Sequence, residues 1–162
     1  MAAAPRKPVS GTSSHAGKYL TFVLGTESYG VPVLRVREII KLMPITAMPQ
    51  VPAHVRGVIN LRGRVIPVIE LRMKLGLMPA EDSDTTCIVV VDVEIDGATR
   101  PLGVLVDRVS EVITIASDQV EATPAFGDGV RVDTLSGVAK VKGTVVLLLE
   151  LDRALGAPGF SF

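Results

Sequence analysis

The amino-acid sequence predicts an all-β protein built from two small barrels that share a core. Many short apolar runs, separated by turns that contain glycine or proline, favour a barrel or a sandwich of strands. Residues 55–76 resemble residues 135–156 without a gap, which indicates an internal duplication. Each half has only about 60 residues and would be marginally stable alone, so we expect the two barrels to pack together.

The duplication rests on two stretches of sequence that recur in the same order. Residues 55–76 read VRGVINLRGRVIPVIELRMKLG, and residues 135–156 read LSGVAKVKGTVVLLLELDRALG. Upstream of these, YGVPVLRVREII at 29–40 resembles LGVLVDRVSEVI at 102–113. The alternative is that two apolar hairpins converged on similar sequences. Two similar segments that recur in the same order favour duplication. The identical positions include Gly57/Gly137, Gly63/Gly143, Glu70/Glu150, Gly30/Gly103 and Val36/Val109.

The first half begins with a tail and two strands. Residues 1–17 are rich in Ala, Pro, Ser, Thr and Gly, a composition that predicts a disordered tail. An apolar strand begins near Lys18, and the polar sequence at 25–28 predicts a turn before the next strand. From Val33, apolar residues fall at helical spacing, which predicts a short helix or an irregular turn that ends before Pro44.

The first half closes with a hairpin, and the second half repeats the plan. Apolar runs flank Gly63 and predict a hairpin with its turn there, followed by a short helical segment at 71–76. The polar, acidic sequence at 79–84 is the best boundary between the halves. Beyond it we expect a strand at 85–95, a turn at Asp96-Gly97, strands at 98–106 and 109–115, a loop at 123–133, a hairpin over 132–151 and a helical end at 152–156. These elements predict a first barrel at about 18–80, a second at about 85–150, a C-terminal helix at 151–156 on the first barrel, and a tail at 157–162.

Composition excludes several classes of partner and place. The 17 basic and 17 acidic residues cancel, which argues against binding to nucleic acid or to an anionic membrane. With four Phe, two Tyr and no Trp, the chain has few aromatic platforms for stacking bases. The single cysteine, Cys87, excludes an internal disulfide and indicates a reducing compartment. The first residues lack an apolar signal core, and no apolar run is long enough to cross a bilayer, so we expect a cytoplasmic protein.

The sequence offers no constellation of residues for catalysis. Neither a phosphate-binding GxxxxGK[ST] loop nor a GxGxxG motif occurs. His15 lies in the expected tail, and His54 has no Cys or His nearby at the spacing of metal ligands. We therefore expect no enzyme activity, no cofactor and no metal. Glu38 and Arg62 are the notable charges, and they form either a docking feature beside an apolar hairpin or two solvated charges.

GVINLRGRVIPVIEL at 57–71 strongly resembles the signature of CheW-type chemotaxis coupling proteins. The resemblance is carried by Gly57, Val58, Asn60, Leu61, Arg62, Gly63, Pro67, Glu70 and Leu71. Glu70 stands where the family more often has aspartate, a minor departure. The similarity continues in order through VPVLRVREII, GVLVDRVSEVI and LSGVAKVKGTVVLLLEL, and covers about residues 18–156.

The resemblance implies two SH3-like, five-stranded β-barrels and a function without catalysis. Such proteins bridge the cytoplasmic tips of methyl-accepting chemoreceptors to a CheA-type histidine kinase, whose regulatory domain has the same double-barrel fold. One barrel end pairs with a kinase barrel, and the groove between the barrels takes the receptor's helical hairpin tip. The alternative function is a stand-alone regulatory barrel that binds a small ligand, which the scarcity of converging polar groups disfavours.

A helical tip that inserts an apolar ridge needs exposed aliphatic residues in the surface that receives it. Glu38 and Arg62 match charged family positions that matter for partner binding, and Gly57 would allow a close backbone approach. The expected partner-binding residues are Val36, Glu38, Ile39, Ile40, Gly57, Arg62, Val104, Val106 and Val109. Some of the valines must belong to the core, because a strand alternates its faces.

Overall fold

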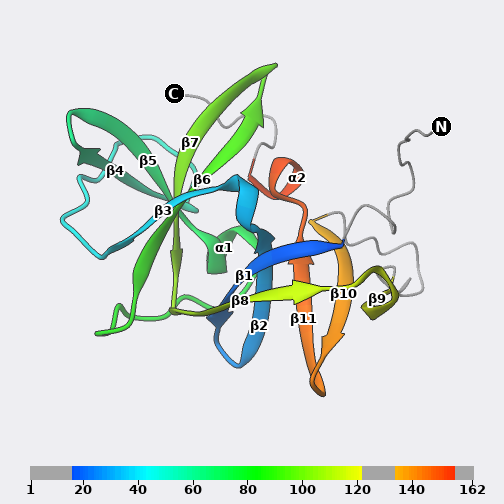
Figure 1. Cartoon of the computed structure of the whole chain (residues 1–162). Coiled ribbons are helices and arrows are strands. Elements are labelled where there is room, and N and C mark those ends of the chain that lie inside the picture. Colours follow the sequence, from blue (N-terminus) through cyan, green and yellow to red (C-terminus); the bar gives the residue numbers. More distant parts are fainter. Residues whose placement is uncertain (1–15, 122–133, 156–162) are drawn as a thin grey trace, which may run out of the picture.

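The computed structural model describes residues 16–121 and 134–155, most of which lie in strands. Figure 1 shows two β-sheets beside each other, with two short helices at their junction. The predicted all-β fold is confirmed. The expected loop at 123–133 and tail at 157–162 lie outside the described residues, as does nearly all of the N-terminal tail.

The strands form two sheets, here named sheet A and sheet B. Sheet A has the order β8-β1-β2-β11-β10-β9, and sheet B has the order β3-β6-β7-β5-β4. Sheet A contains β1 (Gly17–Leu24), β2 (Glu27–Pro32), β8 (Arg108–Ile115), β9 (Val120–Glu121), β10 (Leu135–Val141) and β11 (Thr144–Leu149). Sheet B contains β3 (Val36–Lys41), β4 (Val55–Leu61), β5 (Arg64–Glu70), β6 (Cys87–Ile95) and β7 (Ala98–Val106).

Each sheet is assembled from both halves of the sequence. The duplication makes β2 equivalent to β7, β3 to β8, β4 to β10 and β5 to β11. Sheet A takes β1 and β2 from the first half and the rest from the second, whereas sheet B takes β6 and β7 from the second half and the rest from the first. The expected division into a first barrel at 18–80 and a second at 85–150 is therefore wrong, because the halves exchange two strands reciprocally.

The exchanged strands meet in two parallel pairs that explain a recurring glycine. β11 pairs with β2 at Leu148 and Gly30, and β5 pairs with β7 at Val68 and Gly103. A Cβ atom at Gly30 would lie 3.3 Å from the Leu148 side chain, and one at Gly103 would lie 2.8 Å from the Ile88 side chain. A side chain at either glycine would therefore crowd the barrel interior where the halves join.

The hairpin turns have the backbone that the sequence predicts. Arg62 and Gly63 have φ values of 53° and 88°, and Lys142 and Gly143 have φ values of 52° and 78°. Two positive φ values in a two-residue loop are typical of type I′ turns, which match the twist of antiparallel strands. The Asp96-Gly97 turn has the same geometry, with φ values of 52° and 80°.

The segment after Val33 differs from its expectation. The sequence predicted a short helix or an irregular turn ending before Pro44. The structure has a single 3-10 turn at Val33–Arg35, labelled η2, and strand β3 follows it directly, so the expected helix is wrong. Along β3 half-buried and exposed residues alternate, the period of a strand with one face covered. Pairing with β6, together with the β-branched residues of VREII, overrides the helical spacing of the apolar positions.

Three apolar clusters lie among the described residues, and the largest belongs to both sheets. This shared core contains Phe22 and Val31 of sheet A together with Val89, Val91 and Val104 of sheet B. Smaller clusters fill the interior of sheet A, around Leu148, and of sheet B, around Ile88. The expectation of two barrels with a common core agrees with this packing.

Two short helices cover the shared core. Helix α1 (Leu71–Lys74) follows β5 and buries Leu71. Helix α2 (Leu151–Leu155) follows β11, packs against β6, and buries Leu151, Ala154 and Leu155. Both helices occur where the sequence predicts helical ends, and they occupy equivalent positions in the two repeats.

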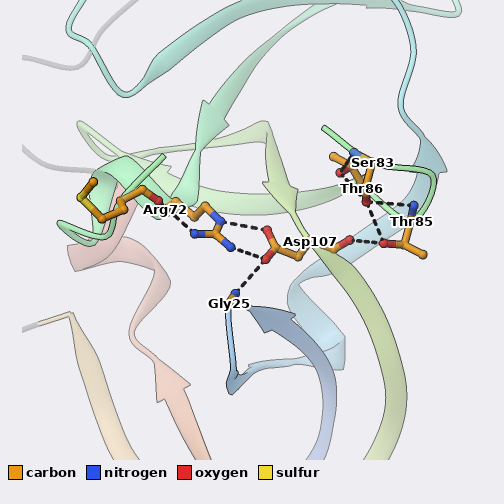
Figure 2. Close-up of polar contacts among 7 residues, drawn as sticks. Gly25, Arg72, Ser83, Thr85, Thr86 and Asp107 are labelled. Atoms are coloured by element: carbon orange, nitrogen blue, oxygen red, sulfur yellow. Dashed lines mark hydrogen bonds and ion pairs between the residues drawn. The ribbon is translucent and has the colours of Figure 1, made fainter. Parts of the chain in front are cut away.

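One crossing of the chain between the sheets is fastened by a hydrogen-bonded ion pair. Asp107 lies between β7 of sheet B and β8 of sheet A. Arg72 of α1 donates from Nε to Asp107 Oδ1 at 3.0 Å and from Nη2 to Asp107 Oδ2 at 2.5 Å, and the amide of Gly25 donates to the same Oδ2 at 2.7 Å (Figure 2). The Asp107 carboxylate thus joins α1, the crossing and the turn between β1 and β2.

At the other crossing, from β2 to β3, a residue of the crossing again pairs with a residue of a short helix. Here the basic residue lies at the crossing and the acidic residue lies on the helix. Arg35 lies at this crossing and pairs with Asp152 of α2. Asp152 Oδ1 also accepts a hydrogen bond of 3.0 Å from the amide of Glu94 in β6. We call Arg72, Asp107 and Gly25 the first crossover clamp, and Arg35, Asp152 and Glu94 the second.

The first clamp lowers the pKa of the Asp107 carboxyl. The hydrogen bonds from Arg72 are the main cause, and the Gly25 amide and the positive charge add to it, while partial burial opposes them. The folded protein therefore favours the carboxylate more than the unfolded chain does. This preference stabilises the fold above the ordinary carboxyl pKa of about 3.9, and the contribution is lost as the pH falls through the folded pKa.

We expect Asp107→Asn to destabilise the protein clearly at pH 7 and progressively less as the pH falls below the ordinary carboxyl pKa of about 3.9 and through the lowered pKa of folded Asp107. Denaturant midpoints of both proteins at a series of pH values from 7 downwards measure this difference. Arg72→Gln breaks the same pair from the other side, so Arg72→Gln combined with Asp107→Asn should cost less than the sum of the two changes. A gap between wild type and Asp107→Asn that stays constant from pH 7 to pH 3 would contradict the role of the carboxylate charge.

The strand exchange predicts that neither half of the chain folds alone. Fragments 1–80 and 81–162, produced separately, should each lack cooperative thermal unfolding, because each leaves two partial sheets without their partner strands. An equimolar mixture should recover the β-sheet circular dichroism of the full chain. Native-like amide dispersion in nuclear magnetic resonance spectra of either fragment alone would show that the exchanged strands are dispensable.

Candidate partner-binding surface

Glu38 and Arg62 meet at one end of sheet B. Glu38 lies on β3, and Arg62 is the first residue of the turn between β4 and β5. The Arg62 guanidinium donates from Nη2 to Glu38 Oε2 and forms an ion pair with it. Asn60 Oδ1 accepts a 2.8 Å hydrogen bond from the Gly63 amide and so supports the turn that presents Arg62. The structure thus brings together the two charges that the sequence singled out.

The pair lies at the surface, where its charge is available to a partner. The Arg62 side chain is 70% exposed, whereas that of Glu38 is 30% exposed. The hydrogen bond from Arg62 to Glu38, and the attraction between their charges, raise the pKa of the guanidinium, which is charged at any physiological pH. An exposed ion pair of this kind contributes little to stability, so its geometry matters more for recognition than for folding.

Two exposed apolar side chains lie on the strands that carry or adjoin the ion pair, one on β5 and one on β3. Val65, three residues beyond Arg62, is 69% exposed, and Ile39 is 46% exposed. Ile40 instead packs against the interior of sheet B. Val65 was missed among the candidate residues, although its place directly after a predicted tight turn could have indicated exposure. We call Glu38, Ile39, Arg62 and Val65 the hairpin surface.

Gly57 allows a close backbone approach, but within this chain. Its φ is 151°, and a Cβ atom there would lie 2.1 Å from the carbonyl oxygen of Thr46. Thr46 and Val58 exchange two backbone hydrogen bonds of 2.9 Å, which lay the segment after β3 along β4. Gly57 therefore lets the barrel of sheet B close, and this is its role in the described structure.

Val104 and Val106 are core residues, which corrects their assignment to an exposed surface. They are 4% and 2% exposed and belong to the shared core. Leu105, between them, points into the interior of sheet B. β7 is a central strand with both faces covered, so no alternation of exposed residues remains there.

Val36 and Val109 occupy equivalent places at the rim of the shared core. Both are partly buried and pack against that core, Val36 from β3 of sheet B and Val109 from β8 of sheet A. Val112 of β8 is 53% exposed, and Leu34, in the middle of η2, is 96% exposed. A surface hollow of about 400 Å³ lies beside Leu34, between η2 and the start of β1. We call Leu34, Val36, Val109 and Val112 the seam.

The described residues offer little to reactive chemistry. Among them no group of three or more His, Cys, Asp or Glu side chains could hold a metal ion. Burial raises the pKa of the Cys87 thiol, which keeps it protonated and unreactive. Within the same part of the chain, no helix is long and apolar enough to span a bilayer.

Comparison with known proteins places these features in one family. The CheW-like domain matches residues 18–158. The chain is 35% identical over 147 residues to chemotaxis protein CheW of Rhizobium meliloti (strain 1021), which covers 86% of this chain and 92% of that protein. It is 36% identical over 144 residues to chemotaxis protein CheW of Bacillus subtilis (strain 168), with 85% and 86% covered.

A solved structure gives the same result for the fold. The crystal structure of scaffolding protein TtCheW from Thermoanaerobacter tengcongensis superposes with a TM-score of 0.79 at 30% sequence identity. The superposition covers 91% of this chain and 97% of that one, so both sheets are included. From the family match, these identities and the shared architecture, it follows that the chain belongs to the CheW-like domain family.

Proposed function

We propose that this protein is a non-catalytic adaptor that couples chemoreceptors to a CheA-type histidine kinase in a chemosensory array. Its relatives are named chemotaxis proteins, and the superposed structure is that of a scaffolding protein. The observation that carries the proposal is the presence of two distinct exposed surfaces, the hairpin surface and the seam, on one jointly packed body. An adaptor needs two docking sites that keep a fixed relation to each other.

The hairpin surface is the proposed site for the kinase. It comprises the Arg62–Glu38 ion pair and the exposed Val65 and Ile39 on the strands that carry or adjoin that pair. An apolar patch with a charged rim suits docking against the end of another barrel, because the apolar contacts give affinity and the charges set orientation. The partner for this surface is the homologous barrel of the kinase regulatory domain.

The seam is the proposed site for the receptor tip. Val36 and Val109 come from different sheets, and exposed Leu34 and Val112 extend the apolar surface around them. A helical hairpin can place aliphatic residues from successive turns on such a surface. The protein would act in the cytoplasm and be recruited to receptor arrays through these contacts.

Arg62→Ala and Glu38→Ala should fold normally but bind the kinase regulatory domain about tenfold more weakly, because each leaves the other charge unpaired in the interface. Isothermal titration calorimetry with the kinase domain and with a receptor cytoplasmic fragment measures both affinities. Lys142→Ala removes the cation at the equivalent turn of sheet A and serves as the matched control, with little change in kinase affinity expected.

Charge reversal distinguishes two ways in which the pair can act. Glu38→Arg combined with Arg62→Glu should restore part of the kinase affinity if mutual pairing shapes the surface, and none if each residue contacts the partner directly. Wild-type affinity of both alanine variants for both partners would refute the hairpin surface as a docking site. Failure of the wild-type protein to bind either partner would refute the adaptor function itself.

A further inference from the structure

The chain passes from one sheet to the other at two equivalent crossings, and a clamp fastens each one. The first half crosses from β2 in sheet A to β3 in sheet B, and the second half crosses from β7 in sheet B to β8 in sheet A. At each crossing a carboxylate accepts a hydrogen bond from an arginine and another from a backbone amide. The carboxylate, the arginine and the amide belong to three different segments of the chain. Both clamps therefore bind together segments that belong to different sheets.

The two clamps use opposite charges at equivalent positions. Arg72 of α1 and Asp152 of α2 occupy the same place in the duplicated sequence, two residues after Glu70 and Glu150. Arg72 pairs with Asp107 at the crossing from β7 to β8, in the first clamp. Asp152 pairs with Arg35 at the crossing from β2 to β3, in the second clamp. In both clamps the arginine also donates a hydrogen bond to a backbone carbonyl. Arg72 donates to Met78 and Arg35 donates to Asp92, each at 2.9 Å.

Each clamp lies within two residues of a valine of the seam. Arg35 directly precedes Val36, and Asp107 stands two residues before Val109. The backbone at Asp107 is fixed as well. Its amide donates to the Val23 carbonyl at 3.1 Å. Its carbonyl accepts a hydrogen bond of 2.8 Å from Thr85 Oγ1 (Figure 2). The clamps thus fix the backbone from which both seam valines project.

We propose that the crossover clamps hold Val36 and Val109 in the relative position that a receptor tip requires, and so control docking at the seam without controlling docking at the hairpin surface. The inference rests on the proposed function and adds Arg35, Asp107 and Arg72 to it as positioning residues. They act through the geometry of the two sheets and need not touch the receptor.

The arrangement of Arg72 and Asp107 suits a positioning role. The Arg72 side chain is 17% exposed, and its planar fork makes two parallel bonds that fix direction as well as distance. An ion pair within one sheet offers a comparison, because Lys140 of β10 and Glu121 of β9 lie 3.8 Å apart and both belong to sheet A. Breaking that pair leaves the relation between the sheets untouched.

The test compares Asp107→Asn and Arg35→Lys with the control variant Glu121→Gln, all in the full-length protein. Calorimetry should show receptor-fragment affinity at least fivefold weaker for both clamp variants, and kinase-domain affinity within about twofold of wild type. Glu121→Gln should leave both affinities nearly unchanged. Arg35→Lys keeps the positive charge but loses the planar guanidinium with its several donors. This variant still tests the clamps if Asp107→Asn does not fold.

A second measurement follows the sheets directly and needs no partner. Spin labels at Arg100→Cys in sheet B and Thr144→Cys in sheet A, with Cys87→Ala, report the distance between the sheets by double electron–electron resonance. The distance distribution should broaden or shift when Asp107→Asn is added and stay unchanged with Glu121→Gln. Loss of both affinities to the same degree, or clamp variants with unchanged distances and receptor affinity, would overturn the inference. If wild type binds no receptor fragment, the proposed function fails while the distance result still judges the clamps.

Discussion

The reciprocal exchange of strands between the two repeats is the constraint on which the rest of this structure depends. Neither barrel can be completed from one half of the chain, because β1 and β2 belong to the sheet that the second half builds, and β6 and β7 to the sheet that the first half builds. The exchange brings β5 against β7 and β11 against β2 in parallel pairs, and it forces the chain to cross between the sheets twice. The shared core, the paired glycines and the crossover clamps all follow from this topology.

An interlocked fold of this kind suits the proposed adaptor function, because it keeps the two proposed docking surfaces in a fixed relation to each other. Two barrels joined by a flexible linker would let each partner dock independently, and a contact at one would not constrain the other. Here Phe22 and Val31 of one sheet pack in the same cluster as Val89, Val91 and Val104 of the other. A receptor bound at the seam and a kinase bound at the hairpin surface would therefore hold each other in a defined relation.

Local features of this fold were predictable from the sequence, and pairing between distant segments was not. Gly63 and Asp96-Gly97 marked their turns because a two-residue loop with positive φ has a strong residue preference. The duplication revealed which strands are equivalent, but equivalence does not say whether a strand pairs within its own repeat or with the other. Val104 and Val106 were misplaced for the same reason, since only the strand order shows that β7 is covered on both faces. The helical spacing after Val33 predicted a helix, but this segment forms strand β3. Its pairing partner β6 comes from the other half of the sequence, and the local pattern could not show that.

The central claim is that the two surfaces serve two partners at the same time on one rigid body. Sedimentation velocity with the protein, a receptor cytoplasmic fragment and a kinase regulatory domain, each labelled with a different chromophore, tests it most directly. The account predicts a sedimenting species that contains all three labels and that disappears when this protein is left out. Displacement of one partner by the other, so that only two labels ever sediment together, would contradict the account.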